Sequence, residues 1–382
     1  MAKKKGNRLK TIGKFLLIVL SVLASLGLLF SFLAQILPPS FSSLVAYCGL
    51  FFPYLLIANF VLTIIWLVVD FTWALIPVLT ILLNVNNIDK HFQFRGIDKP
   101  EVCTNCLKVM SYNVKAFNIY RDDQMSLNRQ FVHFLQNEEP DILCIQEYSY
   151  DNTGKSGFNS TQAIINALKI KDNEKTHKIM LPYRNKLGYQ FGMAIFSKYR
   201  IVGSGVVETG DSSSNKSMYV DIRFNGDTLR VYNIHLASMH LDSTDYATGK
   251  ALWAGSYDSV FNDKTQKLTS KISAAYVVRQ RQAKAVHEHI DNCPYPVILC
   301  GDFNDSPASY SYNKIMSDLR DAFRVSGKGT GTTYIGGNFP AYRIDYIAHD
   351  KHYNDFQYTV CKDLTISDHY PIYTYISIVK KD

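Results

Sequence analysis

The N-terminal part of this chain is an apolar segment that a small soluble fold has no means of burying. Residues 15–85 contain one charged residue, Asp70, and nothing in residues 15–69 offers a polar face. Residues 14–37, KFLLIVLSVLASLGLLFSFLAQIL, exceed the roughly 20 apolar residues that cross a bilayer. They also exceed the apolar core of a typical signal peptide, and no A-x-A-like cleavage site follows. We therefore expect a membrane-spanning helix there.

The rest of residues 14–85, the transmembrane region, predicts one or two further spans. Residues 44–69 form a second apolar run, and residues 71–85 form a shorter one that contains Pro77. The shorter run is either a third span or an interfacial extension of the second. We favour three spans, because Trp66, Asp70 and Trp73 together are typical of a turn at the membrane interface.

The distribution of basic residues sets the expected orientation. The first fourteen residues carry six of the net charge of +8 and no acid, so residues 1–13 are expected to form a basic cytoplasmic N-terminus. Three spans then place the C-terminal part outside the cytoplasm, whereas two spans leave it inside. We expect a multi-pass protein of the cell membrane with its large domain outside.

Residues 86–104 are expected to form a polar linker, and residues 105–382 have the composition of a soluble globular domain. Residues 15–100 balance three acidic against three basic side chains, which leaves about +2 for the large domain. A protein whose main task is to grip duplex DNA carries a stronger positive charge. The charge therefore predicts no stable nucleic-acid partner.

The cysteines are spread thinly, with one close pair. Cys144 and Cys300 lie in apolar runs and are expected to be small core residues. Cys103 and Cys106 form a C-x-x-C, but a second pair and histidines at ligand spacing are missing, which disfavours zinc. A local disulfide and two free thiols both remain open.

The large domain alternates β-rich runs with fewer helical stretches. The sequence NGD joins two of these runs and signals a hairpin. This pattern predicts an α/β fold, a two-layered β-sandwich with flanking helices. The expected strands lie at 106–114, 140–148, 191–199, 217–224, 228–237, 295–305, 341–350 and 369–378, and the expected helices at 127–138 and 265–290.

Polar side chains that suit catalysis stand at or near the ends of these apolar runs. Each alone has an ordinary explanation as a turn, surface or core residue. Together they are expected to converge, because strand ends in a sandwich meet at one rim. They are Asn113, Glu147, His235, Asp302, Asn304, Asp345, Asp368 and His369.

The same set predicts a divalent cation. Carboxylates gathered at one rim repel each other unless a cation or a shared proton offsets the charge. The donor set is rich in oxygen and lacks cysteine, which favours Mg²⁺, or Mn²⁺, over zinc. Two histidines with carboxylate neighbours suit phosphoryl transfer, where a charged transition state needs positioned donors.

The motifs SYNV, DILCIQE, NIHL, GDFND, RIDYI and SDHYPI, in this order, resemble those of the endonuclease/exonuclease/phosphatase (DNase I-like) superfamily. The resemblance covers residues 106–378. The basic start and apolar spans also look like membrane-anchored bacterial members. The family implies a DNase I-like fold and a metal-dependent phosphoric ester hydrolase.

The resemblance also implies roles for individual residues. Asn113, Glu147 and Asp368 match the metal-site amide and carboxylates, with Glu147 the most direct Mg²⁺ ligand. Asp302 matches the group that orients or deprotonates the attacking water, and Asn304 the amide that holds the phosphoryl oxygen. His235 and His369 match the two histidines that contact the phosphate, and Asp345 matches the acid that fixes the tautomer of His369.

Departures from the abasic-site nucleases of the family bear on the substrate. Those nucleases carry an Asp where this chain has Lys115, and they have a different signature at His235. Lys115 is either a contact to an anionic head group or a solvated loop lysine. Arg279 and Arg281 lie on the helix expected at 265–290. They are either residues that reach toward the phosphate site or solvated helix charges. The stretch 239–261, with Leu252, Trp253 and Tyr257, shapes the substrate site or packs over the sheet edge.

Three functions compete on this basis. The favoured one is a membrane-anchored, Mg²⁺-dependent phosphodiesterase or phosphatase whose substrate is a membrane-proximal lipid head group. The second is an extracytoplasmic nuclease. The third is an inactive membrane-tethered binding module, which is disfavoured because every expected catalytic residue is present.

Overall fold

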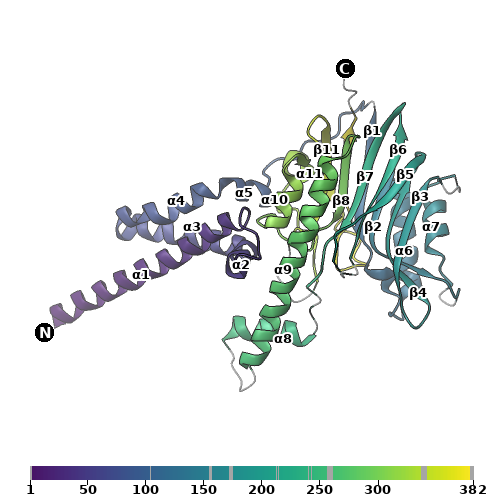
Figure 1. Ribbon diagram of the computed structural model, residues 1–382. Helices are drawn as coiled ribbons and strands as arrows, with labels where there is room; N and C mark the ends of the chain where they lie inside the picture. The colour runs from purple at the N-terminus through teal and green to yellow at the C-terminus, as the bar shows by residue number, and fades with distance from the viewer. Residues whose placement is uncertain are drawn as a thin grey trace.

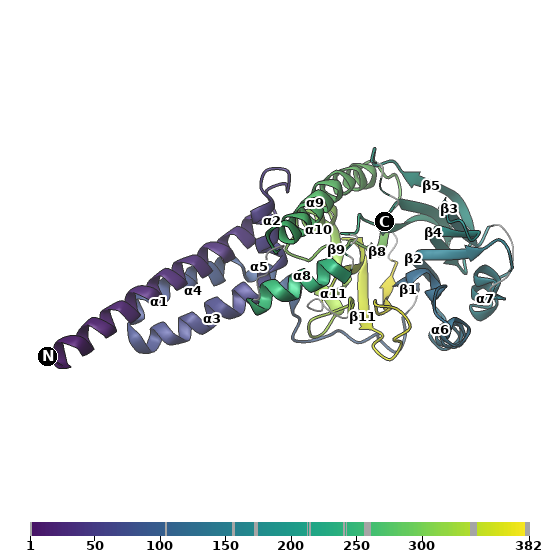
Figure 2. The same cartoon turned by 90° about the horizontal axis from the view of Figure 1, so that it is seen from below.

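The computed structural model combines an elongated helical bundle at the N-terminus with a two-sheet domain (Figure 1). It describes residues 2–103, 105–154, 157–171, 175–211, 213, 215–239, 241, 243–255, 261–336 and 342–378. The bundle projects from one side of the domain, and the N-terminus lies at its far end (Figures 1 and 2).

The N-terminal region contains five α-helices and a short 3₁₀ turn. Two segments, Lys10–Leu33 and Phe52–Val69, are long and apolar enough to cross a membrane. A third candidate is the pair Phe71–Leu83 and Val85–His91, which is bent by 57°. The elements are α1 (Ala2–Leu33), α2 (Ser43–Leu50), α3 (Phe52–Val69), η1 (Phe71–Ala74), α4 (Leu75–Leu83) and α5 (Val85–His91).

The expected second span at 44–69 is wrong as one continuous helix. The run breaks at Phe51, and Pro53 occupies the first turn of α3. Proline has no N–H and its ring clashes with a preceding helical turn, so it begins a helix more readily than it continues one. Within residues 44–69, α3 is the part that is long enough to cross a membrane, whereas α2 lies against the large domain.

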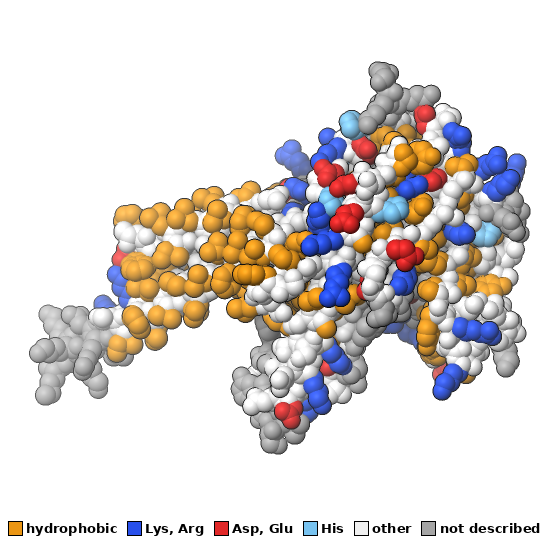
Figure 3. All heavy atoms as spheres, viewed as in Figure 1, with side chains coloured by type: hydrophobic (Ala, Val, Ile, Leu, Met, Phe, Trp, Pro, Cys, Tyr) orange, Lys and Arg blue, Asp and Glu red, His pale blue; other side chains and the backbone are white. Residues whose placement is uncertain are grey.

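A buried asparagine ties the three long apolar segments together. Asn59 of α3 accepts from Ser25 Oγ of α1 at 2.8 Å, and Thr80 Oγ1 of α4 lies 3.5 Å from the same oxygen. Nearby, Trp66 Nε1 donates to Ser21 Oγ at 2.7 Å. Polar side chains that bond between apolar helices are typical of membrane bundles. On the face of the bundle seen in Figure 3, most of the coloured side chains are hydrophobic.

The large domain consists of two six-stranded mixed sheets packed face to face. The first has the order β11-β12-β1-β2-β4-β3 and the second β5-β6-β7-β8-β10-β9. The strands are β1 (Cys106–Asn113), β2 (Ile142–Asp151), β3 (His177–Arg184), β4 (Tyr189–Ser197), β5 (Ile201–Val207), β6 (Ser217–Phe224), β7 (Asp227–His235), β8 (Val297–Asp302), β9 (Leu319–Asp321), β10 (Asp345–Asp350), β11 (Asn354–Val360) and β12 (Ile372–Ser377).

Helices cover the outer face of each sheet, and the two-layered sandwich expected from the sequence is confirmed. Phe131 and Ile164, from α6 and α7, pack on the first sheet, and Val286 of α9 packs on the second. Cys144 and Cys300 are buried between the sheets, as expected. The remaining helices are η2 (Lys115–Asn118), α6 (Gln124–Glu138), α7 (Ser160–Ala167), α8 (Ser243–Ala254), α9 (Phe261–Asp291), α10 (Tyr310–Met316) and α11 (Ala322–Ser326).

A polar bridge joins the two sheets close to the strand ends. Asn233 of β7 is fully buried, and its Oδ1 accepts from Gln146 Nε2 of β2 at 2.7 Å. Its Nδ2 donates to the backbone carbonyls of Ile145 and Ala194, at 2.9 and 3.0 Å. Because these partners belong to the facing sheet, the bridge sets how the two layers align.

The segment expected to be a linker, 86–104, begins as part of a helix docked on the large domain. Asp89 of α5 pairs with Arg324 at 2.6 Å. The buried ammonium of Lys90 donates to Gln35 at the end of the first apolar helix and to Asn313 of α10. Helix α5 therefore connects the bundle to the domain through the side chains of Asp89 and Lys90. Further on, a disulfide joins Cys103 and Cys106.

Candidate active site

The expected site residues meet at one rim because of how the strands pair. The ends of the parallel neighbours β7 and β8 place His235 beside Asp302. Strand β10 runs antiparallel to β8, so its first residue, Asp345, is also opposite Asp302. In the other sheet, Asn113 ends β1, and His369 lies just before β12, the antiparallel neighbour of β1. Residues far apart in the sequence thus reach one place.

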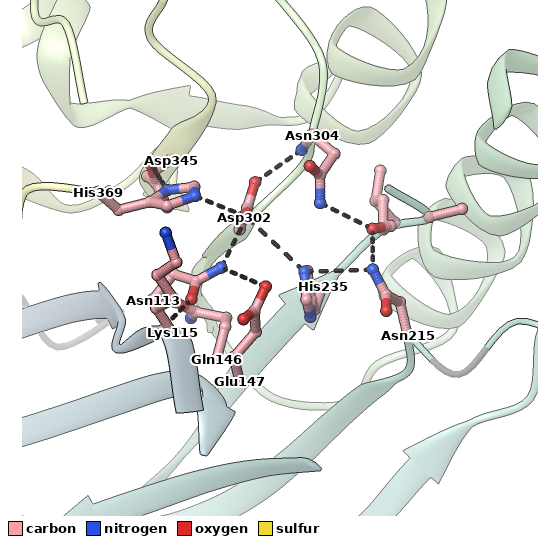
Figure 4. A network of polar contacts seen from close by, with 12 residues as sticks. Asn113, Lys115, Gln146, Glu147, Asn215, His235, Asp302, Asn304, Asp345 and His369 are labelled. Atoms are coloured by element: carbon pink, nitrogen blue, oxygen red, sulfur yellow. Dashed lines mark hydrogen bonds and ion pairs between the residues drawn. The ribbon is translucent and has the colours of Figure 1, made fainter. Parts of the chain in front are cut away.

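Asp302 occupies the centre of the cluster (Figure 4). Its Oδ2 lies 3.7 Å from Nε2 of His235 and 3.7 Å from Nε2 of His369. The same oxygen accepts from Asn113 Nδ2 at 3.1 Å, and Oδ1 accepts from the backbone N–H of Asn304 at 2.8 Å. Burial, together with the nearby Asp345 carboxylate, raises the pKa of Asp302 to about 6. A carboxylate of that pKa can accept a proton near neutrality.

His369 is held by a carboxylate on its other nitrogen. Its Nδ1 donates to Asp345 Oδ2 at 2.9 Å, which directs Nε2 toward Asp302. Burial lowers the pKa of His369, but Asp345 and Asp302 raise it by more, to about 10. The ring of Tyr334 contacts the imidazole edge-on, with 5.1 Å between centroids. Asp345 therefore fixes the ring and favours its protonated form.

His235 lies on the opposite side of Asp302, among amides. Its Nε2 is 3.2 Å from Nδ2 of Asn215. Asn215 Nδ2 also donates to the carbonyl of Leu236 at 2.8 Å, and Asn304 Nδ2 donates to the same carbonyl at 3.0 Å. The sequence did not single out Asn215, because it lies in a polar loop before β6 and outside every recognised motif.

Two of the three expected metal-site residues, Asn113 and Glu147, are in contact, and the third, Asp368, lines the same pocket as Glu147. Asn113 Nδ2 donates to Glu147 Oε1 at 3.3 Å, and burial raises the pKa of Glu147. A register shift in the β2–β4 pairing, between Ile145 and Tyr148, spans Glu147. Glu147 and Asn304 have φ of 50° and 51°, a left-handed conformation that costs non-glycine residues about 1–3 kcal/mol and is concentrated at functional sites.

The donor chemistry at this rim fits a hard divalent cation. Asp302 is buried and Glu147 is half-buried, and both carboxyls have raised pKa values, so each resists carrying its negative charge without a positive partner. Oδ1 of Asp345 is buried and has no hydrogen-bond partner among the described residues. The described residues whose ligand atoms lie within 4.8 Å of one another near this pocket are Asp302, Asp345 and His369, which is not the expected metal-site trio of Asn113, Glu147 and Asp368. The carboxylate and amide oxygens of the expected trio suit Mg²⁺ or Mn²⁺.

Of the three expected substrate-binding residues, only Lys115 is among those described as lining the pocket. Its Nζ pairs with Asp368 at 2.8 Å. Arg279 is fully buried, with Nη1 donating to the carbonyl of Ala237 and Nε 3.4 Å from Asp305. It faces the sheet because it follows the buried Tyr276 by one helical turn, and Arg281 is exposed. Neither arginine is among the described residues that line the pocket, so their expected role in substrate binding has no support there.

The rim opens into a pocket of about 260 Å³. The stretch 239–261 contributes Met239, Leu241 and Tyr246, in line with a substrate-shaping segment, whereas Tyr257 and the side chains of Leu252 and Trp253 lie outside the described residues. The lining comprises Leu50, Lys115, Glu147, Ser238, Met239, Leu241, Tyr246, Asp302, Asn304, Asp305, Ser306, Tyr334, Tyr342, Ile344, Asp368 and His369.

Comparison with known proteins identifies two family matches. The model of the Endonuclease/Exonuclease/phosphatase family matches residues 110–369. A family described as "Domain of unknown function (DUF8431)" matches residues 13–91. Among curated proteins, none matches the chain.

Similar solved structures share the fold at low identity. The human Nocturnin catalytic domain, with a bound sulfate anion, is 15% identical with a TM-score of 0.50, over 75% of this chain and 97% of its own. An endonuclease/exonuclease/phosphatase from Bacteroides vulgatus is also 15% identical with a TM-score of 0.50, over 72% of this chain and 99% of its own. The similarity extends over the two-sheet domain and supports its fold.

Proposed function

Because the chain belongs to the endonuclease/exonuclease/phosphatase family of metal-dependent phosphoester hydrolases, we propose that it hydrolyses a phosphoester in this pocket with Mg²⁺ as cofactor. The observation that carries the proposal is the position of Asp302 Oδ2, 3.7 Å from Nε2 of both His235 and His369. Asp302, a proton acceptor for the attacking water, thus lies between two imidazoles that can donate to the phosphoryl group. This combination suits attack on phosphorus.

Each side chain around the phosphoryl group has its own role in the hydrolysis. Asp302 accepts a proton from the attacking water, whose oxygen forms the new bond to phosphorus as the bond to the leaving oxygen breaks. The leaving oxygen takes up a proton from solvent to become the alcohol, and Asp302 returns its proton to solvent. His369, protonated and fixed by Asp345, donates from Nε2 to a phosphoryl oxygen, where negative charge accumulates. His235 and Asn304 supply further polar contacts to the phosphoryl group.

Glu147, Asn113 and Asp368 would hold the cation, with Mn²⁺ as an alternative to Mg²⁺. When bound there, the ion supplies the positive charge that polarises the phosphoryl group. Asn113 Nδ2 donates to the carboxylates of both Glu147 and Asp302, which holds the amide beside these two groups. Lys115, whose ammonium pairs with Asp368, would meet a second anionic group of the substrate.

We infer that the substrate is a lipid head group. Two helices are long and apolar enough to span a membrane, and α5 fastens this bundle to the domain. The large domain carries only about +2, a weak charge for gripping a nucleic acid. The N-terminus and the large domain lie at opposite ends of the bundle (Figure 1). That arrangement favours three spans and an extracytoplasmic domain.

The competing function is an extracytoplasmic nuclease, which the family membership also allows. The deciding experiment uses the purified full chain in proteoliposomes with Mg²⁺. Release of product is measured from phospholipid vesicles, single- and double-stranded DNA, RNA and inositol phosphates. We expect the highest kcat/KM on a phospholipid. Faster turnover of nucleic acid would establish the nuclease instead, and no turnover of any phosphoester, with Asp302→Ala as blank, would refute the hydrolase.

A further inference from the structure

Helix α2, the segment between the two long apolar helices, is packed along α9 of the catalytic domain (Figure 2). Tyr47 of α2 donates to the carbonyl of Thr269 at 2.8 Å, and its hydroxyl lies 2.8 Å from Ser273 Oγ. Ahead of α2, the N–H of Ser40 donates to Gln280 at 2.9 Å. Such specific contacts hold the connection between the apolar helices in one place on the domain.

The end of α2 reaches the loop that carries the catalytic residues. A Cβ on Gly49 would lie 2.8 Å from the carbonyl oxygen of Ala308, so only glycine permits this approach. The carbonyl of Gly49 accepts from Ser306 Oγ at 3.4 Å. Ser306 lies two residues after Asn304, and the next residue of α2, Leu50, lines the catalytic pocket. The membrane-anchoring region therefore forms part of the site.

The pocket lining combines polar and apolar side chains. The polar ones include the carboxylates, the imidazole and the amide already described. The apolar ones include Leu50 and the catalytic-domain residues Met239, Leu241, Tyr342 and Ile344. A free nucleotide or inositol phosphate has no aliphatic part to cover these side chains. An amphiphile with a phosphoester at one end matches both kinds of lining.

Leu50 is next to the candidate span in the chain. Leu50 is followed by Phe51, and α3, apolar from Phe52 to Val69, begins at the next residue. At this junction Phe51 and Tyr54 remain 38% and 37% exposed and lie with ring centroids 6.4 Å apart. Exposed aromatic rings at the end of a span are typical of the membrane–water interface. The start of the candidate span thus closely follows a residue that lines the pocket.

We propose that Leu50, supplied by the membrane-anchoring region, is a specificity-determining residue that receives the apolar part of a phospholipid whose phosphoester lies in the pocket and faces Asp302 and His369. The inference rests on the proposed phosphoester hydrolysis and adds the source of its selectivity. The anchor then selects the substrate as well as tethering the enzyme. Loss of the Leu50 side chain should weaken use of lipids and spare small soluble esters.

The test compares two kinds of substrate with the full chain in proteoliposomes. One is long-chain phospholipid in vesicles of phosphatidylglycerol, phosphatidylethanolamine and phosphatidic acid. The other is soluble p-nitrophenyl phosphate and its bis ester, which lack an aliphatic part. For Leu50→Ser we expect kcat/KM on the vesicles to fall about 10- to 100-fold, as for removal of a buried leucine contact. Turnover of the soluble esters should stay within about twofold.

Controls separate the pocket from the membrane surface and from folding. Leu44→Ser removes a leucine that is 60% exposed on the same helix and lies outside the described pocket lining, so it should leave both activities unchanged. Leu50→Met keeps the apolar contact and should restore vesicle turnover. Leu50→Phe keeps the packing and narrows the pocket, so it should lower vesicle turnover alone.

The outcomes distinguish the role of Leu50 from the identity of the substrate. Equal vesicle turnover by wild type and Leu50→Ser would overturn the role of Leu50 while leaving lipid hydrolysis intact. Parallel loss of both activities in Leu50→Ser and Leu50→Phe would show a purely structural role and also overturn it. If the wild type cleaves soluble esters and no vesicle lipid, the lipid substrate itself is refuted.

Discussion

His369 Nδ1 donates a hydrogen bond of 2.9 Å to Asp345 Oδ2, and both side chains are buried. The bond leaves only Nε2 of the imidazole to face Asp302 and the pocket. It joins the first residue of β10 in one sheet to the segment before β12 in the other. The catalytic geometry therefore depends on the alignment of two layers as well as on the residues themselves.

Asp345→Asn should test the role of this bond in turnover. The amide keeps the size of the carboxylate but removes the charge that holds His369 protonated and oriented. We expect kcat on a soluble phosphoester to fall by about 10²- to 10⁴-fold with a smaller change in KM. His369→Ala and Asp302→Ala should lose at least as much. A folded Asp345→Asn variant with kcat within tenfold of wild type would contradict the assignment.

Removal of divalent cations should abolish activity. The buried carboxylates at the rim need a positive partner, and the oxygen donors favour a hard ion. We expect EDTA to stop turnover, and Mg²⁺ or Mn²⁺ to restore it. Glu147→Gln should shift the Mg²⁺ titration to higher concentration, whereas Glu208→Gln, outside the described pocket lining, should leave it unchanged. Full turnover in EDTA would exclude metal dependence.

Asn233→Leu should destabilise the large domain. The substitution removes three hydrogen bonds between the sheets and leaves the carbonyls of Ile145 and Ala194 buried without this donor. Each stranded polar group costs about 1–3 kcal/mol, so we expect a fall in Tm of at least about 5 °C. Thermal unfolding of the detergent-solubilised chain measures it, with the exposed Asn137→Ala as control. An unchanged Tm would show that packing alone aligns the sheets.

A reporter placed after Asp98 should settle on which side of the membrane the catalytic domain lies. Asn59 bonds to α1 and contacts α4, which favours a third crossing by the α4–α5 pair. Alkaline phosphatase fused there should be active, because that enzyme folds only outside the cytoplasm. A fluorescent cytoplasmic reporter at the same point should stay dark. The reverse pattern would show two crossings and a cytoplasmic site.

Much of the catalytic domain follows from local pattern. Strands such as β1, β6 and β8 combine β-branched and aromatic residues with turn signals, and their positions were predicted to within a few residues. Strands β3 and β5 were missed, because β3 carries a proline and β5 two glycines among exposed positions. Pairing with neighbouring strands, which local sequence does not encode, holds these segments in the sheet.

In the apolar N-terminal region, hydropathy predicted the segment but not its arrangement. Composition alone marked the apolar segment, since hydropathy is a sum over residues and needs no knowledge of contacts. It did not separate α2 from α3, although Pro53 was present as a signal. It also could not predict that α2 would turn back to the catalytic domain, because that depends on contacts such as Tyr47 with α9.

The chemical groups available to this protein can be read from its sequence: the acids, amides and imidazoles of its motifs, the oxygen-rich donor set and the apolar N-terminal segment. Which of these groups meet depends on the packing of the folded chain. Arg279 and Leu50 illustrate this. Arg279, a charged helix residue, is buried against Asp305, whereas Leu50, from the apolar N-terminal segment, lines the pocket. Burial and contact are set by packing between segments distant in the chain, and periodicity within one segment carries no record of its partner.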